Sequence, residues 1–217
     1  MDSLTGSHKR NLEGIDEPMI IGLSGQKGSG KDTVAAYLVK EHGFERKAFA
    51  DPLKQSIAAL FDIPFSYVDK LKNDDILIGI GRIGQPEYDQ WIQYDGEISK
   101  GLTFREFLQR YGTEAHRDVF GKDFWLDYTL PVQGFYPGRA IVVTDVRFSN
   151  EAIRVRELGG MVVRVTRNSA LDEQNQHRSE VMDFDWDYLI ENDGNFGDLY
   201  MNVEDMLCHM IDRAEAR

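Results

Sequence analysis

The feature that most constrains this chain is a glycine-rich segment, GQKGSGK, at residues 25–31. It follows a short apolar run at 19–23, and it precedes residues 32–41, whose apolar side chains recur at helical spacing. The segment fits the phosphate-binding loop pattern G-x-x-x-x-G-K, which requires a strand before it and a helix after it. Glycines allow backbone N–H groups to line an anion-binding nest, and the helix N-terminus adds partial positive charge. The sequence therefore predicts a strand, a phosphate loop and a helix near the start of the chain.

The phosphate loop also supplies the first candidate side chains. Lys31 can reach the β- and γ-phosphates of a nucleoside triphosphate and follow the charge during transfer. The next position commonly holds Ser or Thr as a Mg²⁺ ligand, and here Asp32 and then Thr33 follow. A carboxylate is a good ligand for Mg²⁺, so the metal ligand stays open between Asp32 and Thr33, and helix capping by Asp32 is the alternative. The predicted cofactor-binding residues of this segment are Gly25, Lys27, Gly28, Ser29, Gly30, Lys31, Asp32 and Thr33.

Strand and helix patterns alternate along the rest of the chain. This alternation predicts an α/β fold, in which a parallel sheet carries helices on both faces. We expect one domain over residues 19–217, after a loose tail at 1–18. Further strands are predicted at 44–50, 140–146, 161–166 and 187–191, and further helices at 52–61, 103–111, 125–130, 150–158 and 199–214.

Two segments lack a regular hydrophobic period. Residues 73–100 are rich in Gly, Asp and Gln, and we interpret them as an irregular insertion with a short hairpin around 91–97. Residues 167–180 are polar, and Arg167 and Arg178 stand near their ends. A segment of this length suits a lid, in which arginines neutralise a transferring phosphoryl group and exclude water.

A second candidate site follows the apolar run at residues 141–144, where Asp145 and Arg147 stand two positions apart. Ligands of open α/β sheets bind beyond the carboxyl ends of the strands. A carboxylate there can hold Mg²⁺ or orient an acceptor, and an arginine can bind a phosphate through two hydrogen bonds. The alternative is that the two side chains pair with each other and shape the loop.

Other basic residues are scattered through the middle of the chain, and most of them are expected to be solvated surface charges. A phosphate acceptor is expected to be held by Arg147 and Lys54, with Arg110 or Arg117. Because an acceptor phosphate is already a nucleophile at neutral pH, the reaction needs no dedicated general base. The predicted catalytic residues are Lys31, Asp145, Arg147 and Arg167.

The composition excludes several other classes of protein. The formal net charge is −12, so polymeric nucleic acid is not an expected partner, since binding to it depends on Lys and Arg. No run approaches the ~20 apolar residues of a membrane span, so a cytoplasmic location is expected, with no membrane partner. The one cysteine, Cys208, forms no disulfide framework and is expected to be buried. The sequence leaves the oligomeric state open, with a homodimer among the options.

Several segments, in order, resemble the phage deoxynucleoside monophosphate kinases. The phosphate loop resembles theirs, including the Asp after the Lys, and the DVR segment that begins at Asp145 resembles their Asp-x-Arg strand end. The other segments that carry the resemblance are ADPLK at 50–54, REFLQ at 105–109, GTE at 112–114, FW at 124–125, NE at 150–151, GG at 159–160, SE at 179–180 and IENDG at 190–194. The resemblance spans the chain from about residue 20 to the last helix, without residues 73–100.

The resemblance implies a three-layer P-loop kinase fold with an acceptor-binding arm and a lid. It also implies ATP with Mg²⁺ as the phosphoryl donor and a deoxynucleoside monophosphate as the acceptor, in host cytoplasm if the source is viral. Asn192 is placed near the donor base by the same resemblance. The substrate-binding residues that we predict are Lys54, Arg110, Thr113, Glu114, Arg117, Arg147 and Glu151.

The sequence leaves two alternative functions open. Animal phosphomevalonate kinases share the SGKD loop, the Asp-x-Arg element and the Ile-Glu-Asn ending, so the chain could act on another small phosphorylated acceptor. A nucleotide-hydrolysing ATPase is the alternative from another class. Such proteins usually carry an acidic pair at the strand end, whereas Asp145 is followed by Val146 and Arg147.

Overall fold

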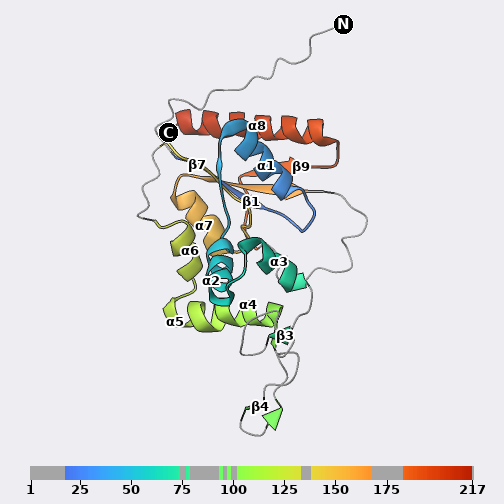
Figure 1. The fold of residues 1–217 in the computed structure, drawn as a ribbon. Helices are drawn as coiled ribbons and strands as arrows, with labels where there is room; N and C mark the ends of the chain where they lie inside the picture. The colour runs from blue at the N-terminus through green and yellow to red at the C-terminus, as the bar shows by residue number, and fades with distance from the viewer. Residues whose placement is uncertain are drawn as a thin grey trace. The chain divides into compact units, whose positions relative to one another are not determined.

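The computed structural model describes residues 18–73, 77–78, 93–94, 97–98, 102–132, 138–167 and 183–216. The chain divides into two compact units, which Figure 1 draws as ribbons. Unit 1 comprises Met1–Lys47 with Val132–Arg217, and unit 2 comprises Ala48–Pro131.

Unit 1 is built on a five-stranded parallel sheet in the order β2-β7-β1-β8-β9. The strands are β1 (Met19–Ser24), β2 (Glu45–Lys47), β7 (Ala140–Val143), β8 (Met161–Thr166) and β9 (Tyr188–Glu191). All six residues of β1 are buried, as are the last three of β7, because helices cover both faces of the sheet. The predicted parallel sheet is confirmed.

The predicted strand at 140–146 is shorter in the structure, but its pairing continues beyond the strand. β7 ends at Val143, and the next residues still donate to both neighbouring strands. The Thr144 N–H donates to the Lys47 carbonyl at 3.0 Å, and the Val146 N–H donates to the Leu23 carbonyl at 3.1 Å. These bonds hold the backbone on both sides of residue 145.

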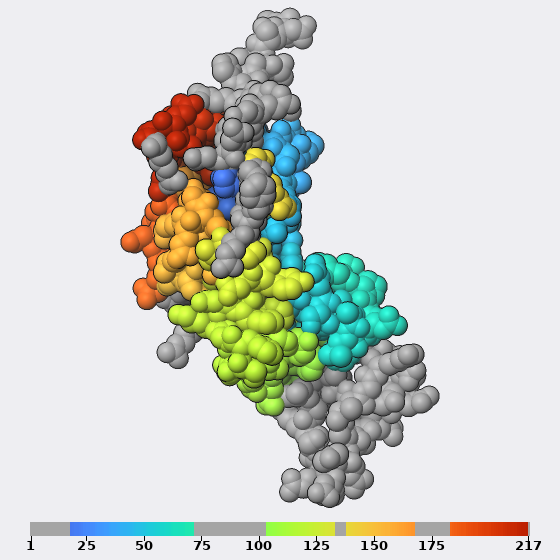
Figure 2. Space-filling view, turned by 90° about the vertical axis from the view of Figure 1, so that its left-hand side faces the viewer, coloured from blue at the N-terminus to red at the C-terminus, as the bar shows by residue number. Residues whose placement is uncertain are grey.

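Three helices flank this sheet. α1 (Lys31–His42) and α8 (Phe196–Glu215) lie on one face, and α7 (Ser149–Glu157) lies on the other (Figure 1). Figure 2 shows α7, in orange, on the outer surface of unit 1. The core between the sheet and the first two helices is made mainly of Leu, Ile, Val and Met side chains from the strands β1, β7, β8 and β9 and from α1 and α8, with Phe44 after α1. The three-layer α/β arrangement that the sequence predicts is therefore confirmed.

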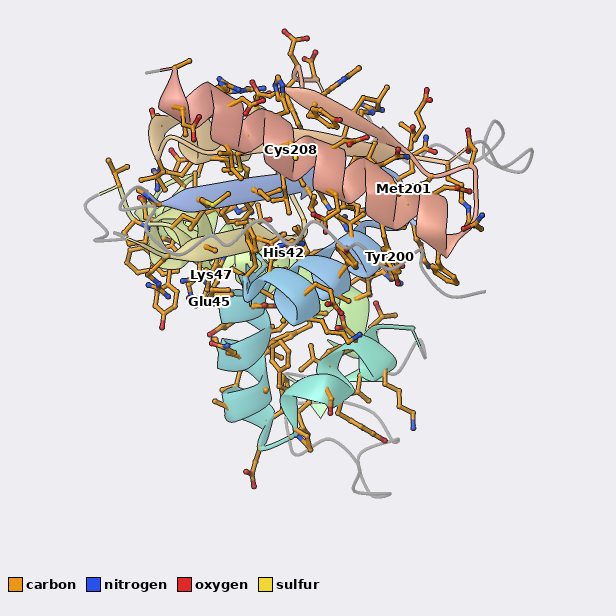
Figure 3. The ribbon with its side chains drawn as sticks, turned by 90° about the horizontal axis from the view of Figure 1, so that it is seen from above. His42, Glu45, Lys47, Tyr200, Met201 and Cys208 are labelled. Carbon is orange, nitrogen blue, oxygen red and sulfur yellow. The ribbon has the colours of Figure 1, made fainter. Side chains whose placement is uncertain are left out.

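A polar and aromatic cluster joins α1 to α8. The rings of Tyr37 and Tyr200 stack with centroids 4.3 Å apart. The Tyr37 hydroxyl donates to Glu204 Oε1 at 2.6 Å, and His42 Nε2 lies 2.8 Å from the same oxygen. Figure 3, which looks down onto α8, labels His42 and Tyr200 on the two helices. Cys208, also labelled, is half-buried rather than buried as predicted.

Unit 2 is mostly helical. Its helices are α2 (Asp51–Phe61), α3 (Phe65–Asn73), α4 (Phe104–Gly112), a π-helix (Thr113–Arg117), α5 (Asp118–Phe120) and α6 (Phe124–Thr129). Ile57, Val68 and Phe104 are fully buried in its core. The helices predicted at 52–61, 103–111 and 125–130 are confirmed within one residue at either end.

Short strands complete unit 2. β3 (Leu77–Ile78) pairs antiparallel with β6 (Leu102–Thr103), and β4 (Gln93–Tyr94) pairs antiparallel with β5 (Glu97–Ile98). The β4–β5 pair confirms the hairpin predicted around 91–97. The remainder of the predicted insertion, the tail at 1–17 and the predicted lid after Arg167 lie outside the described residues.

Candidate functional site

The phosphate loop turns tightly after β1, and two of its glycines are required by the space around them. Gly25 has φ +146°, and a Cβ there would lie 2.2 Å from the Val165 carbonyl oxygen. Gly30 has φ +105°, and a Cβ there would lie 2.3 Å from Asn192 Nδ2. An L-residue with a side chain rarely adopts these conformations, and here the side chain would also collide with its neighbours. The loop can therefore follow this path only because both positions are glycine.

Lys31 is the first residue of α1, and its side chain folds back over the loop. Its ammonium group donates to the Gly25 carbonyl at 2.7 Å and to the Gln26 carbonyl at 2.6 Å. It also lies 3.4 Å from Ser29 Oγ. The structure places the charge of Lys31 at the loop, and its predicted contact with the β- and γ-phosphates stays a prediction.

The residues predicted to hold Mg²⁺ lie in the first turn of α1. Gly30 is the N-cap of this helix, so Asp32 occupies the first turn and is not the cap. The alternative in which Asp32 caps the helix is therefore wrong. Asp32 is exposed and Thr33 is half-buried, and their oxygens suit a Mg²⁺ ion that keeps phosphate and water ligands. Across the described residues, no group of three or more His, Cys, Asp or Glu side chains could hold a metal ion.

The segment after β7 carries the second group of candidates. Asp145 is half-buried and Arg147 is exposed. Glu151, in the first turn of α7, is 4% exposed, and its Oε2 accepts from the N–H groups of Arg147 at 2.8 Å and Phe148 at 3.1 Å. Glu151 therefore anchors the backbone that presents Arg147, while its predicted contact with substrate stays a prediction.

The parallel sheet brings the candidates of unit 1 to one edge. β1, β7, β8 and β9 all point the same way, so the segments that follow them meet at the same edge of the sheet. The phosphate loop follows β1, Asp145 and Arg147 follow β7, Arg167 follows β8 and Asn192 follows β9. Arg167 is exposed at the start of the predicted lid.

Asn192 is buried, and both its side chain and its backbone form hydrogen bonds. It is 7% exposed, and its side-chain amide donates to the Ser29 carbonyl at 2.8 Å. Its own N–H donates to the Thr166 carbonyl at 2.8 Å. The family resemblance placed Asn192 near the donor base, and the structure adds a direct contact with the phosphate loop.

The remaining candidates belong to unit 2, where they lie on helices. Lys54, on α2, is mostly buried, and its ammonium group pairs with the Asp69 carboxylate at 2.8 Å. Asp69 was not among the predicted residues, because no helix was predicted where α3 lies. Arg110 is exposed in the last turn of α4. Thr113 and Glu114 are exposed on the π-helix, and Arg117, at its end, is half-buried.

The π-helix itself was not predicted, and aromatic side chains support it. The Trp125 indole N–H donates to the Gly112 carbonyl at 3.0 Å, and the Trp125 ring lies 4.8 Å from that of His116. His116 Nδ1 lies 2.6 Å from the Tyr111 carbonyl. Such π-turns occur frequently at functional sites, and this one carries Thr113 and Glu114.

Comparisons with known proteins agree on one family. A family model described as deoxynucleotide monophosphate kinase matches residues 19–82 and 82–203. A putative deoxynucleotide monophosphate kinase of Acanthamoeba polyphaga mimivirus is 34% identical over 176 residues, which cover 75% of this chain and 81% of the relative. The deoxynucleotide monophosphate kinase of Escherichia phage RB69 is 23% identical, and the alignment covers 87% of this chain and 99% of that protein.

Two solved structures resemble the chain at low scores. Dephospho-CoA kinase from Campylobacter jejuni is 10% identical with a TM-score of 0.42, covering 89% of this chain and 97% of that one. An APS kinase of Mycobacterium tuberculosis is 10% identical with a TM-score of 0.37, covering 90% of this chain and 98% of that one. Scores this low carry no argument about the site.

Proposed function

Because the chain belongs to the deoxynucleotide monophosphate kinase family, we propose that it transfers the γ-phosphoryl group of ATP to a deoxynucleoside monophosphate. The products are a deoxynucleoside diphosphate and ADP. The observation that carries this proposal is the phosphate loop, in which two glycines that tolerate no Cβ precede Lys31 at the start of α1.

The donor is proposed to bind at the phosphate loop of unit 1. The backbone N–H groups and the N-terminus of α1 favour negative charge, and Lys31 adds a full positive charge beside them. The ammonium group of Lys31 is held by two loop carbonyls. The ammonium group is therefore oriented before the donor binds. When the donor binds, charged phosphate oxygens replace the neutral carbonyl oxygens as hydrogen-bond acceptors, and hydrogen bonds to charged acceptors are stronger.

Phosphoryl transfer needs positioning and charge neutralisation rather than a covalent intermediate. A phosphate oxygen of the acceptor attacks the γ-phosphorus, and the bond from that phosphorus to the β–γ bridging oxygen breaks, with its electron pair leaving on ADP. Lys31 neutralises the charge that develops on the departing β-phosphate. Arg147, whose backbone is anchored by Glu151, is proposed to hold the acceptor phosphate or the transferring group.

Asp32 and Thr33 are the residues proposed to hold Mg²⁺, directly or through water. When bound, the ion neutralises charge on the β- and γ-phosphates. Arg167 is proposed to act from the start of a lid over residues 167–180, where it would help to exclude water from the phosphoryl group.

The acceptor is proposed to be held by unit 2. Lys54 is suited to an acceptor phosphate because its side chain is only 19% exposed and its ammonium group is held beside the Asp69 carboxylate. Arg110, Thr113, Glu114 and Arg117 are the further side chains proposed on this side. Because both named relatives are viral proteins, the cytoplasm of an infected host cell is the proposed place of action.

The experiment that tests this function is an assay of ADP release with ATP and Mg²⁺. We would offer dTMP, dGMP, dCMP, dAMP and phosphomevalonate in separate reactions, with one reaction lacking an acceptor. We expect ADP release that depends on one or more of the four deoxynucleotides. Release of ADP with phosphomevalonate alone would contradict the proposed acceptor. Equal release of ADP without any acceptor would indicate an ATPase.

A further inference from the structure

Asn192 is a buried polar side chain whose main contact is with the phosphate loop. Its side-chain amide donates to the Ser29 carbonyl at 2.8 Å across 163 positions of sequence. Only the nitrogen end of the amide can donate to a carbonyl, so the partner fixes which way the amide faces. The contact therefore ties the end of β9 directly to the loop that follows β1.

The same side chain also covers Gly30. A Cβ at Gly30 would lie 2.3 Å from Asn192 Nδ2, so the loop backbone passes directly over the amide. Gly25, at the other end of the loop, is equally close to the backbone of Val165 in β8. The loop thus rests on the ends of β8 and β9, and Asn192 is the side chain that holds its second half.

The direction of this hydrogen bond matters for anion binding. A carbonyl that turned toward bound phosphates would repel them, whereas N–H groups attract them. In a planar trans peptide, the carbonyl of one residue and the N–H of the next point in opposite directions. By holding the Ser29 carbonyl, Asn192 directs the Gly30 N–H away from itself.

We propose that Asn192 is a positioning residue for the donor phosphates, which acts by fixing the Ser29–Gly30 peptide of the phosphate loop. This inference deepens the proposed function and rests on it, because it assigns a role at the same donor site. It differs from a contact with the donor base, because the effect of Asn192 is transmitted through the loop to the phosphates. The base and sugar of the donor are not needed for that effect.

The chain offers a matched control in Asn202. Its side-chain amide donates at 3.0 Å to the carbonyl of Glu191, the last residue of β9, which directly precedes Asn192. Asn192→Ala and Asn202→Ala therefore each remove one hydrogen bond from an Asn amide to a backbone carbonyl. Only the first bond reaches the phosphate loop.

The test compares the two variants by calorimetric binding of ATP and of inorganic tripolyphosphate, with Mg²⁺ present. Loss of a buried hydrogen-bond donor typically changes an equilibrium that depends on it by about tenfold. Asn192→Ala should therefore lower the affinity for both ligands by about that factor. The KM for the deoxynucleoside monophosphate should stay within about twofold of the wild type. Asn202→Ala should leave both ligand affinities within about twofold, because the loop is untouched.

Three results would overturn the inference. Asn192→Ala that binds both ligands like the wild type would show a purely structural role. Weaker binding of ATP with unchanged binding of tripolyphosphate would show that Asn192 contacts the base or sugar of the donor instead. An equal loss in Asn202→Ala would show that the strand end is generally sensitive.

A second variant covers the case in which Asn192→Ala does not fold. Asn192→Asp keeps the size of the side chain but sets a carboxylate oxygen against the Ser29 carbonyl, so both ligands should bind at least tenfold more weakly. Unchanged binding in this variant would also overturn the inference. The binding measurements need no acceptor, so they decide this inference even if the wild type fails to phosphorylate a deoxynucleotide. That failure would count against the proposed function alone.

Discussion

The two units hold their candidate residues by different means. In unit 1 the proposed donor side is set by backbone, because Gly25 and Gly30 adopt conformations that a side chain would block. In unit 2 the proposed acceptor side consists of side chains on helices, such as Lys54 on α2 and Arg110 on α4. A backbone site tolerates little change in sequence, whereas a side-chain site can exchange residues on an unchanged scaffold. Changes at the loop should therefore be more damaging than changes at the helices.

The largest effect is expected from Lys31→Ala. Loss of a charge that follows the transferring phosphoryl group should lower kcat by about 10²–10³-fold, as removal of one electrostatic contact to a transition state does. The fold should persist, because the side chain contacts loop carbonyls rather than the core. Steady-state kinetics and circular dichroism would measure the two properties.

Lys40→Ala is the matched control for this variant. Lys40 lies on the same helix, and its side chain is 81% exposed beside Glu41. Its removal should leave kcat near the wild-type value. A Lys31→Ala enzyme with unchanged turnover would contradict the donor assignment.

Gly25→Ala should have the next largest effect, on stability as well as activity. A methyl group there would lie against the Val165 carbonyl, and the left-handed φ adds strain, so we expect a loss of about 3 kcal/mol in the free energy of unfolding. Gly28→Ala meets backbone strain alone, because an added Cβ would have no atom within 4 Å beyond its chain neighbours, and it should cost about 1 kcal/mol. Urea denaturation would compare the two variants, and equal losses would contradict the steric argument.

The same difference explains how much of unit 1 could be predicted from the sequence. β1 and β8 are mostly apolar runs, with Arg164 as the one charged residue, and glycine or polar residues follow them. Their limits were therefore evident to within one residue, as was the loop between strand and helix. Asp145 and Arg147 were predicted as candidates because ligands of parallel sheets bind beyond the carboxyl ends of the strands. The contact of Asn192 with Ser29 was not predictable, because it joins residues 163 positions apart through one amide.

Unit 2 was less predictable for a physical reason. In α3 the buried residues Val68 and Leu71 stand among polar residues, so the sequence shows only a weak helical period there. The π-helix is supported by Trp125, which donates to the Gly112 carbonyl and packs against His116 of the π-helix, and local spacing does not reveal these contacts. Asp69, the partner of Lys54, was not predicted because it lies on α3, where no helix was predicted.

Lys54→Ala tests the acceptor side and should have an intermediate effect. We expect KM for the deoxynucleoside monophosphate to rise by about tenfold to a hundredfold, because a charged hydrogen bond to phosphate contributes about 1.5–3 kcal/mol. KM for ATP should change little. Steady-state kinetics with each substrate varied in turn would separate the two effects, and an equal rise in both KM values would contradict the division of roles.

Asp69→Asn sharpens this comparison. If the Asp69 carboxylate competes with the acceptor phosphate for Lys54, removal of its charge should lower KM for the acceptor by a few-fold, that is by about 1 kcal/mol or less. Lys70→Ala is the control on the same helix, since Lys70 is exposed and lies over the Tyr67 ring. A rise in KM for Asp69→Asn would instead show that the carboxylate orients Lys54 for binding.

The smallest effect is expected at the contact of α1 with α8, which lies in unit 1 and includes none of the proposed substrate-binding residues. Tyr37→Phe keeps the ring stacked on Tyr200 but removes the hydrogen bond to Glu204, which should cost about 1 kcal/mol in the free energy of unfolding. Tyr128→Phe, whose side chain is 69% exposed, should cost nothing measurable.

The pH dependence of this difference identifies its cause. Burial, and then the hydrogen bond to Glu204, raise the pKa of Tyr37 above its ordinary value. A pKa that is higher in the folded state gives a contribution that is complete below the unfolded value, about 10, and declines as pH rises through the folded value. The stability gap between wild type and Tyr37→Phe should thus be constant from pH 7 to about 9 and shrink at higher pH. Urea denaturation across this range would measure the gap, and a gap that widens above pH 10 would show that the hydroxyl is not held as a donor to Glu204.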